Sequence, residues 1–128
     1  MFTYLHVRDM TMNQRPISID LHNGLVLAAA PLMMVVPYLL TFSPGIGLLS
    51  FFLGCMLMGV ALAASSPGRR VSLSAIAGFD WTLGLAILSI GVVSGFFGDQ
   101  PVATIFLVGF GAAHLALTAA TRYSARGA

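Results

Sequence analysis

LSAIAGFDWTLGLAILSIGVVSGF, residues 73–96, carries one ionisable side chain, Asp80, in an otherwise apolar or small-residue stretch. A helix needs about 20 mostly apolar residues to cross the hydrocarbon core of a bilayer, and this stretch is long enough. Three further stretches of the same character surround it, at about 20–42, 46–64 and 101–120. The sequence therefore predicts an all-α, polytopic membrane protein with four transmembrane helices.

The composition supports the same class of protein. The 128 residues are 58% hydrophobic and 8% charged, with a mean hydropathy of +0.94. A water-soluble domain of this composition would expose large apolar patches. The four predicted spans also use nearly the whole chain, so we expect no soluble catalytic module and no enzyme activity.

The sequence repeats itself at an offset of roughly 54 to 55 residues. Ile17-Ser18-Ile19 aligns with Val71-Ser72-Leu73. We therefore expect two tandem helical hairpins, at residues 17–65 and 71–121. Each hairpin contains an even number of spans, so both insert the same way round and the repeats are parallel.

A corner of the type aromatic-Ser-Pro, at Phe42-Ser43-Pro44, joins the first two spans, and Gly45 follows it. A repeated two-helix unit with such a corner resembles the small integral membrane proteins of the SPW-repeat type, which have tryptophan after the Ser-Pro pair. The resemblance implies a paired-helix architecture across most of the chain. It implies no particular chemistry.

The arginines predict the orientation of the chain in the membrane. All six basic residues are arginines, and they lie in an N-terminal arm at 1–16, a loop at 66–70 or a tail at 122–128. The positive-inside rule then places both termini in the cytoplasm. Arginine without lysine, together with much alanine and glycine, points to a GC-rich bacterium, so we expect a multi-pass protein of the plasma (inner) membrane.

The expected partners follow from the same features. The arginines are scattered singly or in one pair, which argues against a nucleic-acid partner. The short loops leave only surfaces within the membrane for recognition. We expect contact with the lipid bilayer and with other transmembrane helices, in a larger membrane complex or a homo-oligomer.

Two ionisable residues, Asp80 and His114, lie well inside the predicted spans. A central aspartate costs about 2.5 to 3.5 kcal/mol to insert, so each is a candidate functional residue. Both lie about seven residues from the cytoplasmic end of their helix, roughly 10 Å below that surface. Both also lie on small or polar stripes, which should face other helices. We expect them to form a buried polar pair between the third and fourth spans, with Thr118 as a second candidate partner.

Three interpretations of this pair remain open. A satisfied buried pair can serve only to fix the packing of the second hairpin. It can instead titrate as a coupled site in a proton or ion relay. The third interpretation is that the two residues never meet.

His22 lies near the cytoplasmic start of the first span, beside Asp20 and Asn23, where we expect a solvated helix end. The alternative is that His22 and His114 together hold a haem or chlorin, because imidazole can be an axial ligand. Otherwise we expect no cofactor. We also expect no metal site, because Cys55 is the only cysteine and no histidine cluster accompanies the methionines.

Small residues in every span indicate close helix packing. The glycines expected at helix interfaces are Gly54, Gly59, Gly84, Gly91, Gly95, Gly109 and Gly111. In the first span, Pro31 and Pro37 free the carbonyls of Leu27 and Met33. We therefore expect a bent first helix whose freed carbonyls are covered by protein.

These patterns favour a non-catalytic accessory or scaffold subunit of a larger membrane complex, which acts through lateral helix packing. The alternative function is a small oligomeric proton- or cation-coupled transporter or channel that uses Asp80 and His114. A third is a membrane subunit that holds haem or chlorin through His114.

Overall fold

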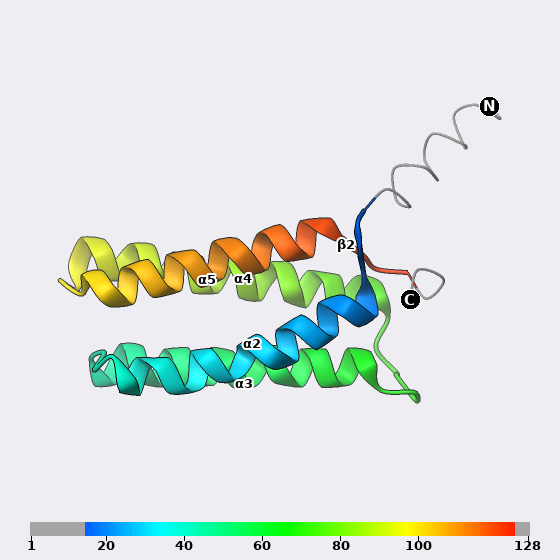
Figure 1. Ribbon diagram of the computed structural model, residues 1–128, viewed down its shortest axis with the longest axis horizontal. Coiled ribbons are helices and arrows are strands. Elements are labelled where there is room, and N and C mark those ends of the chain that lie inside the picture. Colours follow the sequence, from blue (N-terminus) through cyan, green and yellow to red (C-terminus); the bar gives the residue numbers. More distant parts are fainter. Residues whose placement is uncertain (1–14, 125–128) are drawn as a thin grey trace, which may run out of the picture.

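The protein folds into four long helices, as seen in a computed structural model that describes residues 15–124 (Figure 1). All four are long and apolar enough to cross a membrane, so the predicted all-α polytopic fold is confirmed. Most of the expected arm at 1–16 and of the tail at 122–128 lies outside the described residues. The helices are α2 (Ile19–Leu39), α3 (Pro44–Ser65), α4 (Leu73–Phe97) and α5 (Pro101–Ala120).

Local sequence signals explain where the helices begin. Ser18 precedes α2 and Ser72 precedes α4, and each hydroxyl accepts a hydrogen bond of 3.2 Å from a backbone N–H in the first turn. Such caps satisfy donors that a helix leaves free at its start. Pro44 and Pro101 begin α3 and α5, where the missing N–H of proline costs nothing.

The turns within the hairpins are short, four residues between α2 and α3 and three between α4 and α5. Helix α2 ends at Leu39, whereas the sequence suggested about residue 42, because the chain reverses between Leu40 and Ser43. Thr41 in this turn and Asp99 in the other have left-handed backbone, with φ of 55° and 48°. Residues other than glycine adopt this conformation infrequently, and it lets the chain reverse within a few residues.

The helices form two antiparallel hairpins, α2 with α3 and α4 with α5, which lie side by side (Figure 1). Helices of one hairpin pack along much of their length, while the hairpins contact each other chiefly through α3 and α4. The shared core is apolar. Its buried residues are Val26, Ala30, Met33, Leu53, Leu57, Ala61, Leu83, Ile87 and Leu107.

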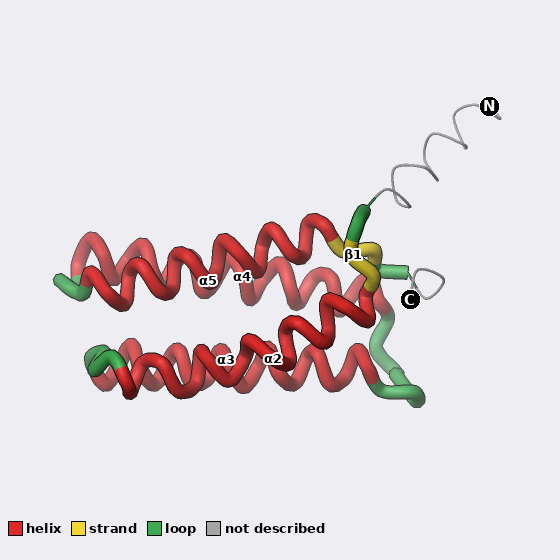
Figure 2. The backbone as a smooth tube through the Cα atoms, viewed as in Figure 1, coloured by secondary structure: helices red, strands yellow, loops and turns green. Residues whose placement is uncertain are grey.

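The two ends of the bundle differ. One end carries the two hairpin turns, and we call it the turn end. The other carries the α3–α4 loop and two short strands, β1 (Ile17–Ser18) and β2 (Thr121–Arg122) (Figure 2). These strands pair in parallel, with Ile17 opposite Thr121, which the sequence did not predict. Because Arg15, Arg69, Arg70 and Arg122 lie at this end, we call it the arginine end.

Polar and aromatic contacts also join the hairpins at the turn end. The backbone N–H of Ser43 donates to Oε1 of Gln100 over 3.0 Å. The rings of Phe42 and Phe106 meet edge to face, with centroids 5.9 Å apart. The two hairpins are therefore held at both ends of the bundle.

The carbonyl freed by Pro37 is covered as expected. The hydroxyl of Ser50 on α3 donates to the backbone oxygen of Met33 over 2.7 Å, and both residues are buried. A free carbonyl in an apolar environment costs several kcal/mol. This bond therefore lets α2 contain a proline inside the bundle.

Close helix packing depends on some of the predicted glycines but not on all of them. A methyl group at Gly111 would lie 2.7 Å from the backbone nitrogen of Leu88, and one at Gly91 would lie 2.8 Å from that of Val108. Neighbouring atoms would also lie within 3.0 Å at three other positions. These are Gly54, Gly84 and Gly95.

Gly59 and Gly109 do not pack against another helix of the same chain within residues 15–124. A methyl group at either position would meet nothing within 4 Å, and both glycines are exposed on the outside of the bundle. Glycine spacing alone does not say which face of a helix is buried. Gly109 and Gly111 are two residues apart and therefore point in nearly opposite directions.

Gly111→Ala and Gly109→Ala form a matched pair of substitutions in α5. We expect Gly111→Ala to destabilise the fold by about 1–3 kcal/mol, because the methyl group would push α5 away from the backbone of α4. Gly109→Ala should raise stability by up to about 1 kcal/mol, through helix propensity alone. Reversible unfolding of the two variants in detergent tests this; equal effects would contradict the assigned faces.

Candidate functional site

The side chain of Asp80 lies in the first third of α4 and is the centre of a buried polar cluster at the arginine end. Its carboxylate is contacted by residues of two other helices and of the segment after α5. Oδ2 lies 3.1 Å from Nε2 of His22 and accepts a hydrogen bond of 2.7 Å from the hydroxyl of Tyr123, while Oδ1 lies 3.6 Å from Nε2 of His114. We call His22, Asp80, His114, Thr121 and Tyr123 the Asp80 cluster.

The expected contact between Asp80 and His114 is present. The 3.6 Å separation is within the range of an ion pair, which extends to about 4 Å. Gly84, one turn after Asp80, makes room for the imidazole, because a methyl group there would lie 3.2 Å from Cδ2 of His114. The small-residue stripe on α4 thus allows α5 to bring its histidine to the carboxylate.

His22 is not at a solvated helix end, so that expectation is wrong. Its side chain is 1% exposed, and its ring centroid lies 5.9 Å from that of His114. Since His22 comes from the first hairpin, the cluster joins the two hairpins. The pair predicted from the sequence, Asp80 and His114, therefore includes only residues of the second hairpin and omits His22.

Tyr123, rather than Thr118, is the hydroxyl partner of Asp80. Thr118 is fully buried, but its hydroxyl has no hydrogen-bond partner. Tyr123 follows β2, and the pairing of β2 with β1 places its ring edge-on to His22, with centroids 5.6 Å apart. The sequence alone does not place Tyr123 in the cluster, because nothing in it shows that the segment after α5 pairs with the segment before α2.

The hydrogen bonds of Thr121 assign a proton to His22. The Thr121 hydroxyl donates to the backbone oxygen of Leu117 over 2.6 Å, so its only proton is used there. Nδ1 of His22 lies 2.8 Å from the same hydroxyl oxygen. That nitrogen must therefore carry a proton and donate it.

A second proton on His22 would stabilise its contact with Asp80. Nε2 lies 3.1 Å from a carboxylate oxygen, and with both ring nitrogens protonated the imidazole would balance the negative charge of the buried carboxylate. That proton would give an ion pair on the imidazole or, transferred to the carboxylate, a neutral pair. Neither Nε2 atom is aligned for a good hydrogen bond with the carboxylate, so the contacts depend mainly on charge.

Backbone contacts hold the cluster in place from the arginine end. Nη1 of Arg15 donates to the backbone oxygen of Thr121 over 3.2 Å. The strand pairing fixes Thr121 opposite Ile17, two residues after Arg15. The segments before α2 and after α5 are therefore held together beside the cluster, where Thr121 contacts His22 and Tyr123 contacts Asp80.

The positions of His22 and His114 bear on whether the two imidazoles could hold a haem or chlorin. Both Nε2 atoms that would ligate a haem iron face the Asp80 carboxylate, so a macrocycle between the two imidazoles would have to displace it. Within residues 15–124, no group of three or more His, Cys, Asp or Glu side chains is arranged to hold a metal ion. The single cysteine, Cys55, is exposed on α3, a helix that contributes no residue to the Asp80 cluster.

Comparisons of the chain with protein-family models, with curated proteins and with solved structures find no match.

Tyr123 is a permanent hydrogen-bond donor at physiological pH. Burial and the negative charge of Asp80 raise the pKa of its phenol well above the ordinary value of about 10. A raised pKa in the folded state means that the phenol stabilises the fold below about pH 10. This contribution is lost as the pH rises further and deprotonation becomes favourable in the unfolded chain.

Tyr123→Phe tests this donor. We expect the substitution to lower the free energy of unfolding by about 1.5–3 kcal/mol, the usual contribution of a hydrogen bond to a charged group. The difference from the unmodified protein should be constant between pH 6 and 9 and should shrink above about pH 10. Unfolding in detergent at several pH values measures it. Tyr38→Phe, on an exposed ring, is the control and should change stability by less than about 0.5 kcal/mol.

Proposed function

We propose that this chain is a non-catalytic membrane protein that binds and releases a proton at the Asp80 cluster, and that this proton controls how firmly its two hairpins are held together. The observation that carries the proposal is the buried contact of 3.1 Å between His22 and Asp80, which joins the hairpins and which a proton on the imidazole would turn into an ion pair. In this proposal, the protein acts as an accessory component of a larger membrane assembly.

The burial of the cluster supports a role for the proton in holding the hairpins. Asp80 is 2% exposed, His22 1% and His114 5%, so water cannot compensate a change of charge. Removal of the shared proton would leave the buried carboxylate without the positive charge that balances it. The contact that attaches α2 to the second hairpin would then be lost.

The remainder of the core favours a binding site over a path across the membrane. From the cluster toward the turn end, most buried residues are apolar, among them Val26, Ile87 and Leu107. The hydroxyls of the buried Ser50 and Ser94 each donate to a backbone carbonyl oxygen, so they do not form a polar chain. A proton relay needs a chain of polar groups or water. A single copy of the chain therefore supports proton binding at one end better than transport.

The outer surface supports action within the membrane. Large apolar side chains such as Phe97, Ile105 and Leu48 are 65–87% exposed. Such side chains are stable in contact with lipid or with the helices of another membrane protein. The short turns offer little surface outside the membrane, which supports lateral assembly.

Asp80→Asn tests the proposed control by the proton. Spin labels on Leu62→Cys and Ala119→Cys, in a Cys55→Ala background, report the separation of the hairpins near the arginine end by pulsed electron paramagnetic resonance. In the unmodified cluster we expect the separation to increase by about 2 Å or more between pH 5 and pH 9. Asp80→Asn should remove this dependence on pH, because it removes the charge that the imidazoles balance.

Asp99→Asn is the matched control, since Asp99 is exposed at the turn end. It should keep the full pH response. A separation that is the same at both pH values with Asp80 present, or a response that survives Asp80→Asn, would contradict the proposal.

We also propose that the arginine end faces the cytoplasm, in the plasma membrane of a bacterium. Exposed Arg69 and Arg70 in the α3–α4 loop support this orientation through the positive-inside rule.

Labelling of single cysteines tests the orientation. In a Cys55→Ala background, we expect an impermeant maleimide to modify Asp99→Cys on intact spheroplasts. Gly68→Cys should react only after the membrane is permeabilised. The opposite pattern would overturn the orientation but not the proton site.

A further inference from the structure

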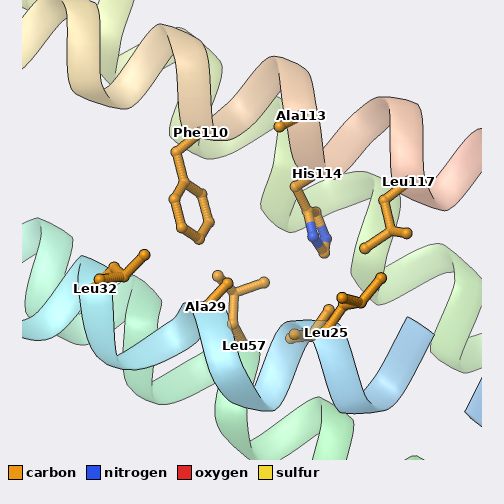
Figure 3. A pocket seen from close by; sticks show the side chains of 9 residues that line it. Leu25, Ala29, Leu32, Leu57, Phe110, Ala113, His114 and Leu117 are labelled. Atoms are coloured by element: carbon orange, nitrogen blue, oxygen red, sulfur yellow. The ribbon is translucent and has the colours of Figure 1, made fainter. Parts of the chain in front are cut away.

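A cavity of about 300 Å³ lies between the hairpins, next to the Asp80 cluster (Figure 3). Residues of α2 and α5 form most of its walls, and Leu57 of α3 closes one side. Leu25, Leu32 and Ala113 line it and are also exposed on the outside of the bundle. The cavity therefore opens sideways, toward the space that lipid occupies around a membrane-spanning bundle.

His114 is the one polar side chain among the residues that line the cavity. It projects from α5 toward α2, between Phe110 and Leu117 (Figure 3). It is 5% exposed, and its Nε2 atom lies 3.6 Å from the Asp80 carboxylate without forming a hydrogen bond. The cavity thus combines apolar walls with one buried imidazole whose capacity for hydrogen bonds is unused.

The walls also favour a flat occupant. The ring of Phe110 hangs into the cavity from α5, and the small side chain of Ala29 lies on the α2 side (Figure 3). Aromatic rings stack with an offset on other rings, and a small residue opposite leaves the necessary gap. A volume of about 300 Å³ is at the lower end of the range for small-molecule sites, and it accommodates one substituted ring with part of a chain.

The charge of the occupant is restricted by the apolar walls. An ionised group here would lose its hydration, and one hydrogen bond to the imidazole of His114 would not offset that free-energy cost. An anionic head would also be repelled by the nearby Asp80 carboxylate. An uncharged carbonyl or hydroxyl can instead exchange one hydrogen bond with His114.

We propose that this cavity binds an uncharged, membrane-soluble ring compound of the quinone class. Its ring lies along Phe110, its carbonyl or hydroxyl group meets the imidazole of His114, and its chain leaves between α2 and α5 into the bilayer. This site goes beyond the proposed proton binding, although both use His114. The proposal concerns binding only and includes no electron transfer.

The test is equilibrium binding of radiolabelled decylubiquinone to the full chain in lipid nanodiscs, corrected for uptake by empty nanodiscs. Ala29→Phe fills the cavity and should weaken binding at least tenfold. Ala28→Phe, on the neighbouring exposed residue, should leave affinity unchanged. Ala113→Leu and Ala112→Leu give a second pair on α5, since only Ala113 lines the cavity.

A second probe, decylbenzene, tests the role of the polar group, because it has a ring and a chain but no carbonyl. We expect it to bind at least tenfold more weakly than decylubiquinone. Equal binding of the two probes would overturn the proposal, and so would unchanged affinity in both cavity-filling variants. Either result would leave the pH response of the hairpins intact, so the two proposals fail separately.

Discussion

A carboxylate inside an apolar helix bundle must be surrounded by groups that balance its charge, and the rest of this structure depends on how Asp80 meets that requirement. The partners come from α2, from α5 and from the segment after α5, so the carboxylate fixes the position of three parts of the chain relative to α4. Leaving such a charge without its partner typically costs about 3–5 kcal/mol. The cluster therefore sets the register of the two hairpins more strictly than apolar packing alone could.

The way in which the hairpins are joined explains where space remains between them. Polar contacts hold them at the arginine end through Asp80, and at the turn end through Ser43 and Gln100. Between these points α2 and α5 touch little, because glycines draw α5 onto α4 and α2 onto α3. The seam between α2 and α5 therefore contains a cavity rather than a tight interface.

The sequence predicts the helices well, because each span is a long apolar stretch with a serine cap or a proline at its start. It also predicts the contact of Asp80 with His114, since both lie at the same depth on small or polar faces of consecutive helices. It does not predict the part played by His22, because periodicity places residues on a face of a helix but does not say how two hairpins meet. Tyr123 is missed for a related reason: its position depends on the parallel pairing of β1 and β2, whose two-residue strands have no recognisable pattern.

Two histidines, His22 and His114, contact the one carboxylate of Asp80. A single histidine would be enough if the contact served only to fix the packing of the helices. With the proton on His22, the charge contact joins α2 to α4 and therefore links the hairpins. With the proton on His114, the same carboxylate would pair with α5, inside the second hairpin, and the link to α2 would weaken. The separations of 3.1 Å and 3.6 Å favour the first arrangement. Because His114 also borders the cavity, any group that forms a hydrogen bond with it there changes the competition between the two imidazoles, and so the strength with which the hairpins are joined.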